Sequence, residues 1–264
     1  MDQLSSGFTH SVKKNIVKDN KSFYSVCVDD FFENPDIIRE FGLSLEKQPD
    51  STGAWPGLRT SSLHSIDPTF SNSFLMKVFS CYFDFLHHDI SWSNSVVYFQ
   101  QIPKFSNNKD DIKNVGWIHQ DIEFDFAGLV YLTPNIDIDS GTSLFNLKNE
   151  NEKFIKFQKH KTLLNLNQRM EDSEYEKEYN EDSKKYYEKT RFNNVYNRLI
   201  CYDAKEFHRA NNFFSSSDDR LTLLFFVKGI NYNLSPYNRV MDKKNFDEYL
   251  ENRIKILKNE NTKS

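Results

Sequence analysis

Apolar and polar positions repeat with a helical period in the first third of the chain and with an extended period after residue 95. Between residues 72 and 87, apolar side chains recur every three or four positions, which predicts an amphipathic helix. Another helix is predicted to begin at Asn34 and Pro35, because asparagine suits the N-cap and proline suits the first turn. We therefore expect a helical region over residues 30–90.

After residue 95, short runs rich in aromatic and β-branched residues predict strands separated by turn sequences such as Thr133-Pro134-Asn135. The predicted strands cover residues 96–102, 115–122, 127–132, 198–202 and 221–227, and an earlier strand covers residues 22–28. Because helices do not alternate with these strands, the sequence favours an antiparallel sandwich or small barrel preceded by helices.

Residues 149–194 form a charged insert within this β-rich region. The second half, which includes the run 171–178, holds too few aliphatic residues for a core of its own. The pattern indicates a solvated helical excursion, and a mobile lid over a site is the alternative. Beyond the last strand, residues 245–258 show the spacing of an amphipathic C-terminal helix. Residues 1–264 are expected to be a single domain whose β-rich core covers residues 95–228.

The composition narrows the function classes. The chain has 34 Lys and Arg against 38 Asp and Glu, a formal net charge of −4, which does not predict binding to nucleic acid or anionic membranes. The longest apolar run, residues 221–227, is too short to cross a bilayer, and residues 1–20 lack the apolar stretch of a signal peptide. Cys27, Cys81 and Cys201 are odd in number and widely separated, so we expect buried reduced thiols in a cytoplasmic protein.

The triplet His119-Gln120-Asp121 carries the strongest candidate chemistry. In a strand, residues i and i+2 project from one face, so an imidazole and a carboxylate converge there without a special turn. His208, which follows the strand predicted over residues 198–202, can supply a third ligand from a distant segment. Two histidines and one carboxylate on one face of an octahedral ion leave three adjacent positions open, an arrangement that suits non-haem Fe(II) and O2.

A lone His-x-Asp triplet is weak evidence, and the chain contains a second one at His87-His88-Asp89. That triplet lies at the end of the helix predicted over residues 72–87. There, residues i and i+2 do not face each other, and the helix dipole explains a histidine. His160 has basic neighbours and no strand after it, so we expect it to face solvent.

Arg220 follows His208 by twelve positions and opens an apolar strand. An inward-facing guanidinium needs a partner because burial of an unpaired charge is costly. A dicarboxylate that also chelates the metal would supply this partner through a bidentate pair. The alternative is an arginine at the sheet edge, paired with Asp218 or Asp219.

Taken in chain order, these motifs resemble the 2-oxoglutarate/Fe(II) dioxygenases, in particular small uncharacterised bacterial and phage-type members of the prolyl-hydroxylase-like branch. The matching segments are residues 117–121, 128–132, 140–142, 197–203, 208 and 220–222. The resemblance implies a double-stranded β-helix, or jelly-roll, core. The chain departs from the family in its long insert and in the single glycine, Gly141, before the strand 142–147, which bears on the substrate side of the site.

The same resemblance implies roles for individual residues. His119, Asp121 and His208 would bind Fe(II), and Arg220 would bind the C5 carboxylate of 2-oxoglutarate with a further hydroxyl from Thr222. The activity implied is oxidation of 2-oxoglutarate by O2 to succinate and CO2, coupled to hydroxylation of an amino-acid, peptidyl or small-molecule substrate.

Other features stay open between two interpretations. Tyr98, Gln100 and Tyr131 are candidates for the pocket wall next to the co-substrate, with ordinary packing as the alternative for each. Residues 55–60, which contain Trp-Pro-Gly and an arginine, are either a substrate-holding segment near the mouth or an ordinary loop. For the whole protein, the rivals are a non-catalytic jelly-roll module that binds a metal or ligand, and a zinc-type hydrolase or isomerase on a similar barrel.

Overall fold

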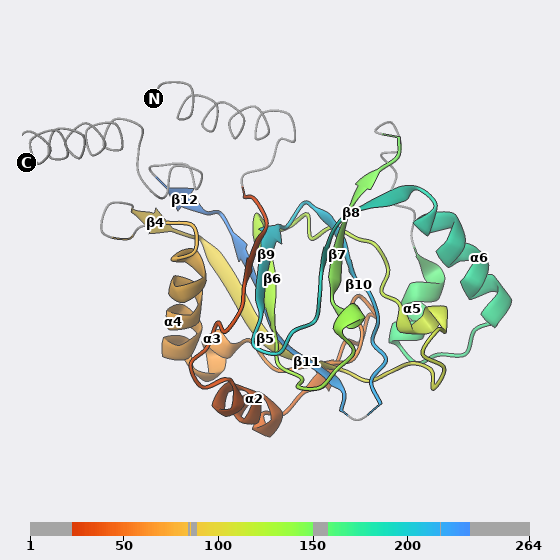
Figure 1. Cartoon of the computed structure of the whole chain (residues 1–264), viewed down its shortest axis with the longest axis horizontal. Helices are drawn as coiled ribbons and strands as arrows, with labels where there is room; N and C mark the ends of the chain where they lie inside the picture. The colour runs from red at the N-terminus through yellow and green to blue at the C-terminus, as the bar shows by residue number, and fades with distance from the viewer. Residues whose placement is uncertain (1–22, 84, 86–88, 150–157, 217, 233–264) are drawn as a thin grey trace, which may run out of the picture.

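The computed structural model describes residues 23–83, 85, 89–149, 158–216 and 218–232 of the 264-residue chain (Figure 1). The C-terminal helix expected over residues 245–258 lies outside the described residues, as do both histidines of the His87-His88-Asp89 triplet. Within the described ranges, no helix is long and apolar enough to cross a membrane.

An antiparallel sheet of seven strands forms the centre of the fold, in the order β1-β9-β6-β11-β5-β3-β2. The strands are β1 (Val26–Val28), β9 (Leu199–Asp203), β6 (Phe126–Tyr131), β11 (Arg220–Lys228), β5 (Asn94–Ile102), β3 (Leu58–Arg59) and β2 (Gln48–Pro49). Strand β11 pairs with β5 along its full length and with β6 on its other side, so it forms the middle of the sheet.

A smaller antiparallel sheet packs against the first one, with the order β10-β7-β8. Its strands are β10 (Phe207–Ala210), β7 (Thr142–Leu147) and β8 (Tyr186–Phe192). Leu144 and Phe192 of this sheet share an apolar cluster with Leu129 and Ile200 of the main sheet. A separate two-stranded sheet pairs β4 (Ile90–Ser91) with β12 (Asn231–Tyr232). The expectation of a mainly β protein with antiparallel sheets is confirmed.

Three helices cover the outer face of the main sheet: α2 (Pro35–Ser44), α3 (Leu63–Ile66) and α4 (Pro68–Phe79) (Figure 1). Alternation along β11 divides its side chains between two environments, because successive residues of a strand point to opposite faces. Leu223 and Phe225 join the large core under the helices, where the ring of Phe225 lies 5.5 Å from that of Phe74. Arg220 and Leu224 point to the opposite face, toward the smaller sheet.

The first residues of α2 and α4 can be compared with the starts predicted from the sequence. Helix α2 begins at Pro35 with Asn34 as its N-cap, as predicted, although the Asn34 side chain makes no capping hydrogen bond. The boundaries predicted for the next helix, 72–87, are wrong. Helix α4 begins at Pro68, where the Asp67 side chain accepts a hydrogen bond from the Phe70 N–H, and it ends at Phe79. The Asp-Pro pair is a helix-start signal of the same kind as Asn34-Pro35.

The strand predicted over residues 115–122 is wrong as a regular element. Within it, only His119 forms a bridge, which is antiparallel and joins it to His208 of β10. The Gly116 N–H donates to the Ala210 carbonyl and the His119 N–H donates to the His208 carbonyl. Three positions along this segment therefore correspond to two along β10, so one extra residue interrupts the ladder.

The insert is more ordered than the charge pattern indicates. It contains α5 (Lys159–Asn165), α6 (Asp172–Ser183) and the whole of β8, which is the outer strand of the smaller sheet. Tyr175 and Tyr179 of α6 are buried and pack edge-on against Trp117, with ring centroids 5.6 and 5.3 Å away. The aromatic side chains of the insert do not form a separate core; they complete a small core together with Trp117, which lies in a distant part of the chain.

Two further predictions about single residues need correction. His160 is buried rather than solvent-facing: its Nδ1 lies 2.7 Å from the Glu178 carboxylate and its Nε2 lies 3.3 Å from that of Glu174. The cysteines are all free, as expected, but only Cys201 is buried and Cys27 is exposed. Cys27 faces outward because β1 is an edge strand whose alternate residues point to solvent.

Candidate metal centre

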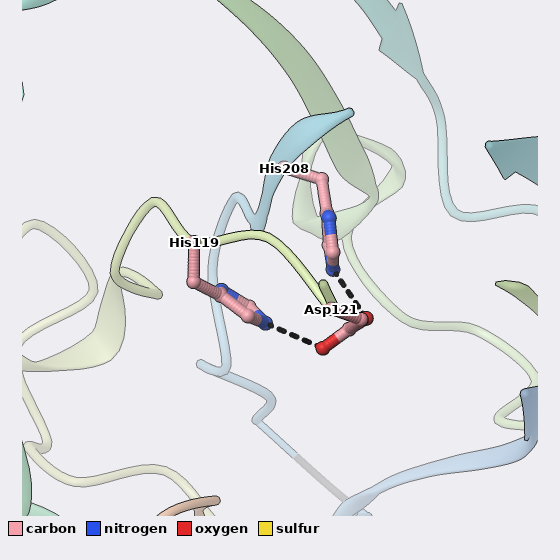
Figure 2. Close-up of side chains that lie close together, drawn as sticks. All are labelled: His119, Asp121 and His208. Carbon is pink, nitrogen blue, oxygen red and sulfur yellow. Dashed lines mark ion pairs between the residues drawn. The ribbon is translucent and has the colours of Figure 1, made fainter. Parts of the chain in front are cut away.

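Three potential metal ligands converge between the two sheets (Figure 2). His119 and Asp121 lie on the irregular segment that follows Trp117, and His208 lies on β10. The backbones of His119 and His208 exchange both hydrogen bonds of an antiparallel pair, at 3.0 and 2.9 Å. These two hydrogen bonds fix the histidines opposite each other. The third potential ligand, Asp121, follows His119 by two residues.

The ligand atoms are close to the spacing that an octahedral ion requires. Asp121 Oδ2 lies 3.3 Å from His208 Nε2, and Asp121 Oδ1 lies 4.0 Å from His119 Nε2. One ligand atom from each of the three residues lies within 4.8 Å of the others. Adjacent ligands at about 2.1 Å from a metal stand about 3 Å apart, so small side-chain rotations are sufficient to close the site.

Hydrogen bonds orient both imidazoles toward the common centre. The Nδ1 of His119 lies 2.9 Å from the Trp117 carbonyl, and the Nδ1 of His208 lies 3.0 Å from the Glu206 carbonyl. A carbonyl oxygen only accepts, so each Nδ1 carries the hydrogen and each Nε2 presents its lone pair to the centre. Metal-binding histidines in proteins are held by the same kind of outer hydrogen bond.

The electrostatics favour a cation among the three groups. Partial burial, with His208 as the next cause, lowers the pKa of His119, so this imidazole is neutral at neutral pH. Burial opposes ionisation of Asp121, but His208, His119 and Arg59 together outweigh it and hold the pKa of Asp121 below its usual value. Burial lowers and Asp121 raises the pKa of His208, with a net upward direction. Asp121 Oδ2 is buried and accepts no hydrogen bond from the residues that the structure describes. This donor set fits a divalent metal ion, which would satisfy that oxygen.

Arg220 is buried without a carboxylate partner among the described residues. It is 3% exposed, and in that part of the chain its buried Nε and Nη2 atoms have no hydrogen-bond acceptor. The two acids considered as edge partners are engaged elsewhere: Asp218 pairs with Arg39, and Asp219 accepts from the Gln101 side chain. The edge-arginine alternative is therefore wrong, and the guanidinium presents unused donors.

Arg220 and the three candidate ligands line one cavity of about 420 Å³ between the sheets. Tyr98 and Gln100 of β5 also line this cavity. Tyr131 and Thr222 do not belong to its lining. They are buried on the same face of the main sheet, in register with each other across β6 and β11, and the Tyr131 hydroxyl donates to Thr142 Oγ1 at 2.9 Å. Residues 55–60 do contribute to the cavity, through Trp55, Pro56 and Arg59.

Several cavity residues carry no signal in the sequence. Tyr202 lines the cavity and its ring centroid lies 4.9 Å from that of His208, yet in sequence it is one more aromatic in a strand. Lys161, Leu164 and Asn165 of α5 form the wall on the insert side. The insert was expected to be solvated, so nothing local to these three residues pointed to the cavity.

Comparison with protein-family models matches residues 11–220 to a family of unknown function, DUF6445. The chain belongs to this family. No curated protein matches the chain.

Members of the 2OG-Fe(II) oxygenase family are among the similar solved structures. One from Burkholderia pseudomallei is 10% identical with a TM-score of 0.41, over 77% of this chain and 84% of that chain. HygX from Streptomyces hygroscopicus, with nickel, 2-oxoglutarate and hygromycin B bound, is 12% identical with a TM-score of 0.46, over 82% and 86%. A Trichoplax adhaerens prolyl hydroxylase in complex with a hypoxia inducible factor peptide is 11% identical with a TM-score of 0.45, over 83% and 93%. At these values, a functional assignment depends on the side chains of the site.

Proposed function

We propose that this protein is an Fe(II)- and 2-oxoglutarate-dependent oxygenase. The observation that carries the proposal is the combination of a two-histidine, one-carboxylate centre with a buried guanidinium on the wall of the same cavity that has no carboxylate partner among the described residues. His119, Asp121 and His208 would hold the metal on one face and leave three adjacent positions open. Arg220 would bind the far carboxylate of 2-oxoglutarate.

The roles of the protein groups follow from their contacts. The backbone pair between His119 and His208 keeps the metal face fixed, and the carbonyls at Trp117 and Glu206 keep each Nε2 turned toward it. The Arg220 fork offers its free N–H groups to a carboxylate as a bidentate, charge-assisted pair. Iron and 2-oxoglutarate, when bound, would supply the oxidation of a C–H bond by O2, with release of succinate and CO2.

The proposal extends to the fold and the pocket wall. The main and smaller sheets are taken as the two halves of a double-stranded β-helix within a single domain, with the site between them. Tyr98 and Gln100 would contact bound ligands directly, because they line the cavity. Tyr131 and Thr222 do not line the cavity and would instead help to position Arg220. The ring centroid of Tyr131 lies 5.5 Å from the Arg220 guanidinium carbon.

Anaerobic absorption spectroscopy with Fe(II) and 2-oxoglutarate tests this function. Chelation of ferrous iron by the keto acid gives a weak visible charge-transfer band, which we expect from the wild-type protein. The band should be absent from His208→Ala. In Arg220→Ala it should require a much higher 2-oxoglutarate concentration. Arg191→Ala is the matched control, since this arginine lies on β8 and pairs with Glu188 at the surface. A wild-type protein without the band would favour a zinc enzyme or a binding module instead.

A further inference from the structure

Two further cations line the cavity that holds the candidate metal ligands: Arg59, at the end of β3, and Lys161, on α5. They belong to segments about a hundred residues apart in sequence. The Asn165 side-chain amide joins these segments by donating to the Gly53 carbonyl at 2.9 Å. The loop before β3 and helix α5 therefore meet, and each brings one basic side chain to the same cavity.

The Arg59 guanidinium packs against two aromatic rings, and some of its N–H groups have no acceptor among the described residues. Its guanidinium carbon lies 4.4 Å from the centroid of the Trp55 ring and 5.7 Å from that of Tyr98. The only hydrogen bond of its side chain within the described residues is a long one, 3.5 Å, from Nη2 to Gln100 Oε1. Its Nε is buried without an acceptor. A stacked guanidinium with an open edge is an arrangement that suits a planar carboxylate.

The nearby acids do not neutralise Arg59. Among the described residues, no carboxylate oxygen lies within 4.0 Å of its guanidinium. Asp50 is near enough to interact through its charge, but it accepts hydrogen bonds from the Thr52 hydroxyl and the Ala54 N–H. Burial is the main cause that lowers the pKa of Arg59, to about 10, and Asp121 opposes it. Arg59 remains charged at neutral pH.

Lys161 is also without a direct partner in the part of the chain that the structure describes. Acids on the neighbouring helix α6 are used by other groups: Asp182 bonds with Lys185 and with Gln158, and Glu178 holds His160. Burial lowers the pKa of Lys161, while the charges of Asp121 and Asp182 oppose that change. Lys161 therefore lines the cavity without a hydrogen-bond or ion-pair partner among the described residues, and an ammonium group can donate three hydrogen bonds.

In the occupied site, the charges of the proposed ligands would balance without Arg59 and Lys161. With the proposed ligands bound, a divalent metal and Arg220 balance the carboxylate of Asp121 and the two carboxylates of 2-oxoglutarate. Of the acidic residues that line the cavity, only Glu123 then remains, and it is exposed. Two partly buried cations without a partner are costly, and an anion between them would offset that cost.

We propose that Arg59 and Lys161 bind a carboxylate of the substrate that is oxidised, so that the substrate is an organic acid or an acidic side chain of a peptide. This inference rests on the proposed function, because it assigns Arg220 to the co-substrate and leaves Arg59 and Lys161 for the second molecule. Leu129, Leu224 and Phe226 form an apolar wall of the same cavity, which suits the hydrocarbon part of such an acid.

A binding experiment with a simple acid tests the proposal without knowledge of the natural substrate. The full chain is loaded with Ni(II) and saturating 2-oxoglutarate, and its melting temperature is measured against benzoate and against the neutral benzamide of nearly the same shape. Benzoate should raise the melting temperature and benzamide should not. Arg59→Gln and Lys161→Gln should each weaken benzoate binding by about tenfold or more, since each removes one desolvated charge contact. Lys159→Gln, an exposed lysine on the same helix, is the matched control and should bind as the wild type.

The outcomes separate this inference from the proposed function. If the Fe(II)/2-oxoglutarate band forms but benzoate does not bind, or benzamide binds equally well, the anionic subsite is wrong and the oxygenase proposal stands. If Arg59→Gln raises the 2-oxoglutarate requirement, Arg59 belongs to the co-substrate site instead. N-acetyl-leucine against its amide, and an acetylated glutamyl peptide against its glutaminyl counterpart, then distinguish a free acid from a peptide through substrate-stimulated succinate release.

Discussion

Gly116 offers a test of how the metal centre is held, because it lies three residues before His119 at the closest approach to β10. A Cβ atom added at Gly116 would lie 2.7 Å from the Ala210 carbonyl oxygen and 3.0 Å from the Ala210 nitrogen. Both are backbone atoms, so no side chain can rotate away. Reaching the ordinary contact distance of 3.4 Å requires the segment and β10 to separate by roughly 0.7 Å.

Gly116→Ala should therefore change both stability and metal affinity. Overpacking of this kind costs about 1–3 kcal/mol of unfolding free energy. A displacement of this size exceeds the tolerance of about 0.5 Å for a preorganised site. The His119 backbone is hydrogen-bonded to His208 on β10, the strand that Gly116→Ala would displace. We therefore expect metal affinity to fall by about 10–100-fold, the loss typical when residues that hold the metal ligands in place are changed.

Urea denaturation of the metal-free protein and anaerobic Fe(II) titration in the presence of 2-oxoglutarate measure the two effects separately. Gly42→Ala is the matched control, since its Cβ would meet the Phe99 ring at 2.4 Å on the helix side of the main sheet. It should lose stability and keep its metal affinity. If Gly116→Ala binds Fe(II) as the wild type does, or if Gly42→Ala loses the same affinity, close packing of segment and strand does not position the ligands.

The remaining predictions concern the ligands and the co-substrate. His119→Ala and His208→Ala should abolish Fe(II) binding in a titration and leave the circular dichroism spectrum unchanged, because the apolar clusters that pack the two sheets contain neither imidazole. Arg220→Ala should raise the 2-oxoglutarate concentration for half-maximal succinate release by a factor equivalent to about 2–5 kcal/mol, and Arg220→Lys should recover only part of it. Metal affinity should fall as the pH drops through the pKa of His208, because protons then compete with the metal for Nε2. Asp121 raises this pKa against the effect of burial. A metal affinity that does not change with pH would contradict the assignment of His208 as a ligand.

The sequence predicted those parts of the fold that depend on local pattern. Alternating apolar residues gave most of the strands in place, including β11, and the Asn34-Pro35 signal gave the start of α2. The predicted start of α4, at residue 72, is four residues late, because the helix begins at the Asp67-Pro68 capping pair and not at the first residue of the apolar period. Local propensity and local turn chemistry are properties of neighbouring residues, so a single sequence carries them.

The errors fall where a distant segment decides the structure. Residues 115–122 have strand composition, but the ladder is broken because three of their positions meet two on β10. His160 has basic neighbours in sequence, whereas α6 brings two glutamates to it in space. For the site, the pattern of His119, Asp121, His208 and Arg220 was sufficient to nominate the residues that converge. Lys161 could not be nominated, since its relation to the cavity depends on how the insert packs.

That packing also changes the interpretation of the insert. Trp117, two residues before His119, donates from Nε1 to the Tyr175 hydroxyl, and Arg209, next to His208, donates to the Tyr179 hydroxyl at 2.7 Å. Helix α6 thus contacts the neighbours of both histidine ligands at once. The insert also supplies β8 to the smaller sheet. Under the proposed function, we therefore expect the helix pair to act as a wall rather than as a lid that closes as a whole. This wall would support the candidate metal ligands through α6 and present Lys161 through α5, so that recognition of an acidic substrate would share its scaffold with metal binding.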